Sequence, residues 1–136
     1  MNPLSVVLVF KISATVLAWC IPLLLMPAEL LEQVGLPPHP SYMFLRMLGW
    51  AYVALCVGYW FSLRASLHGK RLMPPIHVGI VSNGGACLFL LYYGSTGAWQ
   101  EWGLLLQFIG WSSNAATALI TAGLIRYGVY GNDPLA

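Results

Sequence analysis

The stretch GLLLQFIGWSSNAATALITAGLI, residues 103–125, decides the fold of this chain. It contains no charged residue and exceeds the roughly 20 mostly apolar residues that a helix needs to cross a bilayer. Three further stretches meet or approach that length, at residues 4–26, 43–63 and 76–93. The sequence therefore predicts an all-α integral membrane protein, a four-helix bundle that forms one four-span domain over residues 1–136.

The composition independently excludes a water-soluble globular protein. Hydrophobic residues make up 59% of the chain and charged residues 7%, against roughly 45–50% and 25% in soluble domains. So few charges cannot cover the surface of a small soluble fold, and the solvent must be lipid. The net charge is +2, and no basic run is longer than Lys70-Arg71. Nucleic acid is therefore excluded as a partner.

Basic residues near the span ends predict the orientation of the bundle. Most of them fall on the side of the second loop and the end of the fourth span, where the sequence places Lys11, Arg64, Lys70, Arg71 and Arg126. The opposite side holds Arg46 together with Glu29, Glu32 and Glu101. Because cytoplasmic loops are enriched in Lys and Arg, we expect a multi-pass protein with both termini in the cytoplasm. The first span lacks a basic n-region and a small-residue cleavage site, so we expect an uncleaved helix.

The loop after the first span predicts a short amphipathic helix on the membrane surface. Leu30, Leu31 and Val34 alternate with Glu29, Glu32 and Gln33 at helical spacing, and Gly35 is placed to end the helix. The helix either shields the end of the bundle or forms a lid over an outward-facing pocket.

Polar residues recur at helical spacing along the fourth span, as Gln107, Gly110, Trp111, Asn114, Thr117, Ala118 and Thr121. An unpaired amide in hydrocarbon costs on the order of several kcal/mol. We therefore expect Gln107 and Asn114, with Asn83 of the third span, to point into the bundle. Two interpretations remain open: hydrogen bonds between helices, and the lining of a ligand cavity.

Two cations and two tryptophans within the spans can each have a structural or a ligand-binding role. Arg46 can pair with Glu29 or Glu32 or contact a ligand. Lys11 lies about 10 Å along the helix from Leu4, so we expect an anchor that snorkels to the surface, with a functional charge as the alternative. Trp50 and Trp111 either pack or contact a bound molecule. The candidate ligand-binding residues are Arg46, Trp50, Asn83, Gln107, Trp111 and Asn114.

Catalytic and metal chemistry have little support in the sequence. His39, His68 and His77 lack ligand spacing, and Cys20, Cys56 and Cys87 are read as small buried hydrophobes. No Ser, His and acid set can be nominated, so we predict no catalytic residue, metal or cofactor, and favour a non-catalytic protein. The spans also lack the embedded carboxylate that proton-coupled transport usually needs.

The segment Phe44-Leu45-Arg46-Met47-Leu48-Gly49-Trp50-Ala51-Tyr52-Val53-Ala54-Leu55 follows a Leu-Pro-Pro loop. It resembles the second span of small four-helix bacterial membrane proteins of the DoxX-like kind. The resemblance implies a four-helix bundle in the bacterial cytoplasmic (inner) membrane, with Arg46 and Gly49 as fold-defining positions. Some relatives of this kind are subunits of membrane oxidoreductases.

Three functions follow as hypotheses. The first is an accessory subunit that partners another membrane protein or a second copy of itself, because small residues such as Ala51, Ala54 and Gly58 share a helix face. The second is a bundle that binds a lipid, a quinone or a small apolar ligand. The third is a small oligomeric transporter or channel, since four helices enclose little pore alone.

Overall fold

The computed structural model describes residues 2–38 and 41–131, and every regular element in them is a helix. The first span is continuous through α1 (Pro3–Thr15), the π-helical turn η1 (Val16–Cys20) and α2 (Ile21–Leu25). A short helix follows, α3 (Ala28–Gln33), and then the remaining spans, which are α4 (Met43–Leu67), α5 (Met73–Ser95) and α6 (Leu104–Gly123) continued by η2 (Leu124–Val129). Four helices are thus long and apolar enough to cross a membrane, which confirms the all-α membrane bundle. His39 and Asp133 lie outside the described residues.

The helices extend beyond several predicted ends. The third span was predicted to begin at residue 76 because of Pro74-Pro75, yet α5 begins at Met73. Proline is tolerated in the first helical turn because the N–H groups there have no acceptor within the helix. The second span continues to Leu67 and the fourth, through η2, to Val129, because polar and aromatic residues continue a helix beyond its apolar core.

Glycine in the left-handed conformation follows three of the helices. Gly35, Gly69 and Gly97 have φ values of 103°, 69° and 81° and come directly after the caps of α3, α4 and α5. After α3, for example, the Leu36 N–H donates to the Leu31 carbonyl at 3.0 Å. This is the Schellman pattern, which satisfies carbonyls at the helix end. The structure confirms the short surface helix and its end at Gly35.

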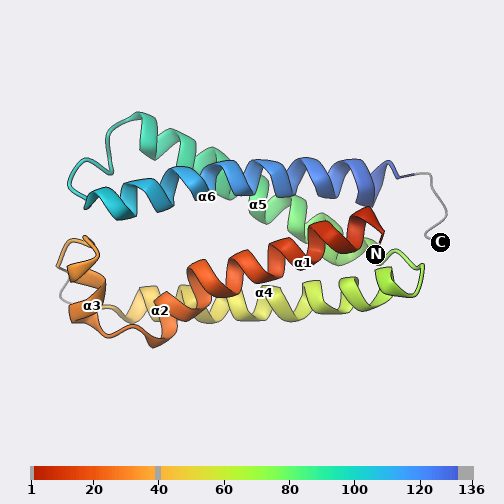
Figure 1. Cartoon of the computed structure of the whole chain (residues 1–136), viewed down its shortest axis with the longest axis horizontal. Coiled ribbons are helices and arrows are strands. Elements are labelled where there is room, and N and C mark those ends of the chain that lie inside the picture. The colour runs from red at the N-terminus through yellow and green to blue at the C-terminus, as the bar shows by residue number, and fades with distance from the viewer. Residues whose placement is uncertain (1, 39–40, 132–136) are drawn as a thin grey trace.

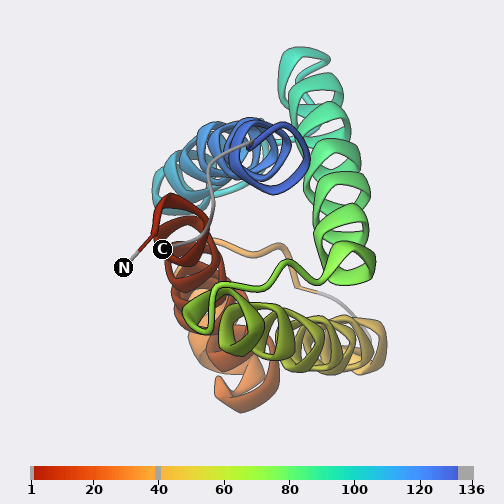
Figure 2. The ribbon, with the colours of Figure 1, turned by 90° about the vertical axis from the view of Figure 1, so that its right-hand side faces the viewer.

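The spans pack as two pairs, α1 with α4 and α5 with α6 (Figures 1 and 2). The start of α1 and the end of η2 lie at one end of the bundle, together with the α4–α5 connection, and we call this the terminal end (Figure 1). The opposite end carries α3 and is called the α3 end. There the Gly103 N–H donates to the Gly35 carbonyl at 3.0 Å, which joins the loop after α3 to the start of α6.

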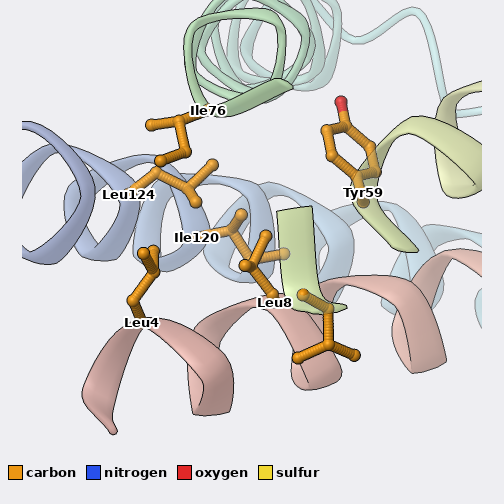
Figure 3. Packing of buried hydrophobic residues seen from close by; sticks show 7 residues of the cluster. Leu4, Leu8, Tyr59, Ile76, Ile120 and Leu124 are labelled. Carbon is orange, nitrogen blue, oxygen red and sulfur yellow. The ribbon is translucent and has the colours of Figure 1, made fainter. Parts of the chain in front are cut away.

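An apolar cluster joins the two pairs in the terminal half of the bundle. Its side chains come from all four spans and point toward one another (Figure 3); they are Leu4, Leu8, Tyr59, Leu63, Ile76, Ile120 and Leu124. Beyond the cluster, polar contacts fasten α1 to the end of α4. Asn2 caps α1 through the Ser5 N–H at 2.8 Å and donates to the Ser66 carbonyl at 2.8 Å. These contacts fix the start of α1 against the end of α4.

A π-helical turn interrupts the first span just before Pro22. In this turn the Ile21 N–H donates to the Val16 carbonyl, five residues back rather than four. Proline supplies no N–H, and its ring crowds the carbonyl four residues earlier, here that of Ala18. The wider turn accommodates the proline without breaking the span, as π-bulges do in other helices.

Arg46 and Gly49 hold α2 against α4. The Arg46 guanidinium donates to the Leu23 carbonyl at 2.6 Å and to the Met26 carbonyl at 2.5 Å. It therefore satisfies carbonyls at the C-terminal end of α2, which have no partner within the helix. A Cβ at Gly49 would lie 2.9 Å from Leu24 Cγ and 3.0 Å from Leu23 Cβ. The absence of a side chain at Gly49 allows this close approach.

We predict that Gly49→Leu destabilises the bundle by about 1–3 kcal/mol, because the added side chain forces α2 away from α4. The measurement is thermal unfolding of the purified protein in mild detergent. Gly58→Leu is the matched control, since Gly58 lies on the same helix and a Cβ there meets nothing within 4 Å. Equal melting temperatures for the two variants would contradict the role of Gly49.

Candidate functional site

A cavity of about 470 Å³ lies between the two helix pairs. Its volume falls within the roughly 300–1,000 Å³ of small-molecule sites. All four spans supply its walls, which are mainly apolar and small side chains: Lys11, Ala14, Thr15, Ala18, Trp19, Tyr52, Leu55, Tyr59, Ser82, Asn83, Ala86, Phe89, Leu90, Phe108, Ile109, Ser112, Ser113, Ala116, Thr117 and Ile120. Along α6 the lining extends from Phe108 to Ile120, about 18 Å at 1.5 Å per residue.

The two ends of the cavity differ. Toward the terminal end it stops at Tyr59 and Ile120, which belong to the apolar cluster (Figure 3). Elsewhere the lining includes exposed residues. Phe89 and Phe108 are 65% and 70% exposed, and Ala18 and Ser112 are exposed as well. The cavity therefore opens sideways onto the surface of the spans, the surface that lipid covers in a membrane protein.

A polar group of three side chains occupies the closed end. The Lys11 ammonium lies 4.0 Å from the centroid of the Tyr59 ring, in cation–π geometry. The Tyr59 hydroxyl is hydrogen-bonded to the Ser82 hydroxyl at 2.9 Å. We call Lys11, Tyr59 and Ser82 the head group site. It joins α1, α4 and α5, so its geometry depends on how these three helices pack.

Gly79 sets the distance between the helices at the head group site. A Cβ at Gly79 would lie 2.7 Å from Leu124 Cδ1, 3.3 Å from Tyr59 Cε1 and 3.8 Å from Lys11 Cε. Without a side chain there, α5 approaches α4 and η2 closely. The Gly79 carbonyl accepts a hydrogen bond from the Asn83 amide at 2.6 Å, which fixes Asn83 on the cavity wall.

Lys11 does not snorkel, contrary to the expectation from the sequence. Its residue is 3% exposed, and its ammonium lies inside the bundle beside Tyr59. Leu4 and Leu8, which precede it on the same helix, belong to the apolar cluster (Figure 3). Within residues 2–38 and 41–131, no carboxylate lies close enough to form an ion pair with it. An ionisable group inside the membrane is a candidate functional site by default, and the cavity adds space beside it.

The predicted ligand-binding residues are dispersed in the structure. Asn83 is the only one of the six that lines the cavity. Arg46 bonds backbone carbonyls at the end of α2, rather than Glu29 or Glu32. Trp50 is 68% exposed on the outside of α4. The position of Trp50 suits contact with lipid rather than with a molecule inside the bundle.

The remaining three predicted residues belong to contacts near α5. Trp111 packs edge-on against Trp99 with ring centroids 5.2 Å apart. Gln107 donates to the Trp102 carbonyl at 2.8 Å. Asn114 accepts a hydrogen bond from the Cys87 thiol at 3.2 Å. The polar face of the fourth span therefore makes helix-to-helix and helix-to-loop contacts.

Thr117 is the one residue of the predicted polar stripe of the fourth span that also lines the cavity. The wall that α6 supplies is the neighbouring face of the helix, with Ser112, Ser113 and Ala116. Sequence reasoning also missed the wall on the first span. The sequence does contain a pattern that indicates this wall. Ala14, Thr15 and Ala18 follow Lys11 at spacings of three, four and seven, which places them on one face of a helix.

The described residues hold no cluster of three or more His, Cys, Asp or Glu side chains that could bind a metal ion. Comparison of the chain with protein-family models, with curated proteins and with solved structures gives no match. The function therefore has to be argued from the cavity itself.

Proposed function

We propose that the protein binds an amphipathic small molecule, a lipid or a quinone, within the membrane. The observation that carries the proposal is the cavity of about 470 Å³, apolar along its length and polar at its closed end. Binding sites of this kind are mostly apolar, with a few polar groups that orient the ligand. The sideways opening supports the same function, because a hydrophobic ligand can reach the cavity from lipid without crossing water.

The head group site supports an acceptor-rich head on this ligand. Lys11 supplies N–H donors, and the hydroxyls of Tyr59 and Ser82 can each donate or accept. Such donors suit the oxygens of a lipid head or of a quinone. The apolar part of the ligand would then extend along the walls toward Phe89 and Phe108, where it meets the hydrocarbon of the bilayer.

We predict that Ala116→Phe removes this ligand. Ala116 lines the cavity, and a phenyl group there fills part of it. Native mass spectrometry from mild detergent should show a small-molecule adduct on the wild-type protein and about tenfold less of it on the variant. Ala115→Phe is the matched control, because Ala115 is exposed on the adjacent position of the same helix. A wild-type protein without an adduct, or an adduct that Ala116→Phe leaves intact, would contradict the proposal.

A second proposal is that the bundle acts as an accessory subunit of a membrane assembly. Ala51 and Ala54 are exposed on α4, and a Cβ at Gly58 would meet nothing within 4 Å. Membrane helices pack through such small residues because these let two backbones approach closely. This face is therefore open to a helix of another protein or of a second copy.

For this second role we expect native mass spectrometry to detect a larger complex that Gly58→Leu abolishes. The variant should keep the melting temperature of the isolated chain, since the added side chain has free space. Gly85→Leu, on α5, is the control, because the space beside Gly85 is equally open. A complex that survives Gly58→Leu would rule out this face as its interface.

We also propose that the protein lies in a bacterial inner membrane, as the resemblance to DoxX-like proteins implies, and that both termini are in the cytoplasm. The basic residues Arg64, Lys70 and Arg71 lie near the connection of α4 and α5, at the terminal end, and Arg126 lies in η2. Glu29, Glu32 and Glu101 lie in or near the connections at the α3 end. The positive-inside rule supports this orientation.

The orientation predicts opposite labelling of two single cysteines in a cysteine-free background. A membrane-impermeant maleimide should label Glu101→Cys on intact cells, whereas Lys70→Cys should react only after the membrane is permeabilised. Both native side chains are exposed, so accessibility within the protein does not separate them. The reverse pattern would invert the topology.

A further inference from the structure

Among the residues that the structure describes, no negatively charged side chain balances the ammonium at the head group site. Lys11 is 3% exposed, and the lining of the cavity contains no Asp or Glu. The face of the Tyr59 ring at 4.0 Å attracts the ammonium, but it carries no formal charge. A buried cation is unfavourable unless a charged partner is present. A molecule in the cavity can supply that partner.

The hydrogen bonds around Lys11 leave room for an acceptor on the ligand. Asn83 directs its amide N–H groups to the Gly79 carbonyl at 2.6 Å and to Ser82 Oγ at 3.4 Å. Ser82 Oγ has one hydrogen, which it can give to the Gly79 carbonyl at 3.3 Å or to the Tyr59 hydroxyl at 2.9 Å. When Ser82 donates to Tyr59, the phenol hydrogen of Tyr59 is free for a ligand oxygen. The site thus offers one ammonium and one hydroxyl to the same bound group.

A carboxylate matches this donor set best. It carries one negative charge, equal to the one positive charge of Lys11, and its two oxygens can take the ammonium and the hydroxyl together. A phosphate monoester head carries up to two negative charges, and Lys11 is the only cation among the described residues that line the cavity. A phosphodiester head carries one negative charge but continues on both sides of the phosphate, whereas the site lies at the closed end of the cavity. A neutral quinone accepts hydrogen bonds but does not balance the ammonium.

We propose, building on the proposed function, that the ligand is a long-chain carboxylic acid whose carboxylate pairs with Lys11 and Tyr59. Its alkyl chain extends along the apolar walls toward Phe89 and Phe108. The lining there is suitable because Leu55, Ala86 and Leu90 are apolar. The cavity would then select its ligand by the negative charge of the carboxylate as well as by the length of the alkyl chain.

The test compares palmitate with hexadecanol, which has the same chain length and a neutral head, and with a short-tailed ubiquinone. Binding to the purified, delipidated full chain is measured by competition with radiolabelled palmitate and by the shift in melting temperature. For the wild-type protein we expect palmitate to bind at least about tenfold more tightly than either neutral molecule. This comparison needs no variant, so it remains informative if a substitution impairs folding.

The variant Lys11→Met tests whether Lys11 causes the preference for palmitate over hexadecanol. We expect the variant to lose at least about tenfold in affinity for palmitate and to bind hexadecanol within about twofold of wild type. Bound hexadecanol also shows that the cavity is intact in the variant. Lys70→Met is the matched control, because Lys70 is exposed outside the spans, and it should change neither affinity.

The outcomes separate this inference from the proposed function. Equal binding of palmitate and hexadecanol, tighter binding of the quinone, or a palmitate affinity that Lys11→Met leaves unchanged would each overturn the carboxylate inference. In all three cases a molecule still binds, and its loss in Ala116→Phe would uphold the proposed function. If none of the three molecules binds and native mass spectrometry shows no adduct, both proposals fail.

Discussion

The close approach of helix backbones at glycine is the constraint on which the rest of this structure depends. In hydrocarbon, helices gain nothing by burying apolar side chains against each other, so shape and hydrogen bonds must hold them together. Gly49 brings α4 onto α2, Gly79 brings α5 onto α4 and η2, and Gly110 lies against the Trp99 ring. These contacts join the spans into a bundle, and they also decide where the spans separate. The cavity occupies that separation, closed on one side by the apolar cluster of the terminal half.

Lys11 gains its importance from this packing. A lysine at the same depth on an isolated helix would extend its ammonium along the helix to the nearest interface. Here the ammonium is buried beside Tyr59, which belongs to the same apolar cluster as Leu4 and Leu8. A charge inside the bundle has to be stabilised by the groups around it. In the proposed complex, a molecule bound in the cavity supplies the acceptor. The same packing therefore creates the space and the charge that the proposed ligand would use.

The sequence predicted what depends on local composition. Twenty apolar residues in a row define a span whatever its neighbours are, and Gly35 ends α3 through a local hydrogen-bond pattern. Positions that depend on a neighbouring helix were harder to predict. The polar face of the fourth span was recognised, yet periodicity cannot tell whether a face meets another helix or a cavity. Asn114 therefore meets Cys87, while Ser113 and Ala116, each one position before a residue of the predicted stripe, line the cavity. Trp50 shows the same limit, because a tryptophan within a span can face lipid or protein.

The π-helical turn at Val16–Cys20 lets the two halves of the first span face different neighbours. An extra residue in one turn rotates everything beyond it by about 100° relative to an uninterrupted α-helix. The half that carries Lys11 faces the cavity, whereas the half that carries Leu23 lies against Gly49 of α4. In an uninterrupted α-helix, the direction of one face would fix the direction of the other. With the turn between them, substitutions that reshape the cavity wall need not disturb the contact between α2 and α4, so the shape of the cavity and the assembly of the bundle can change independently.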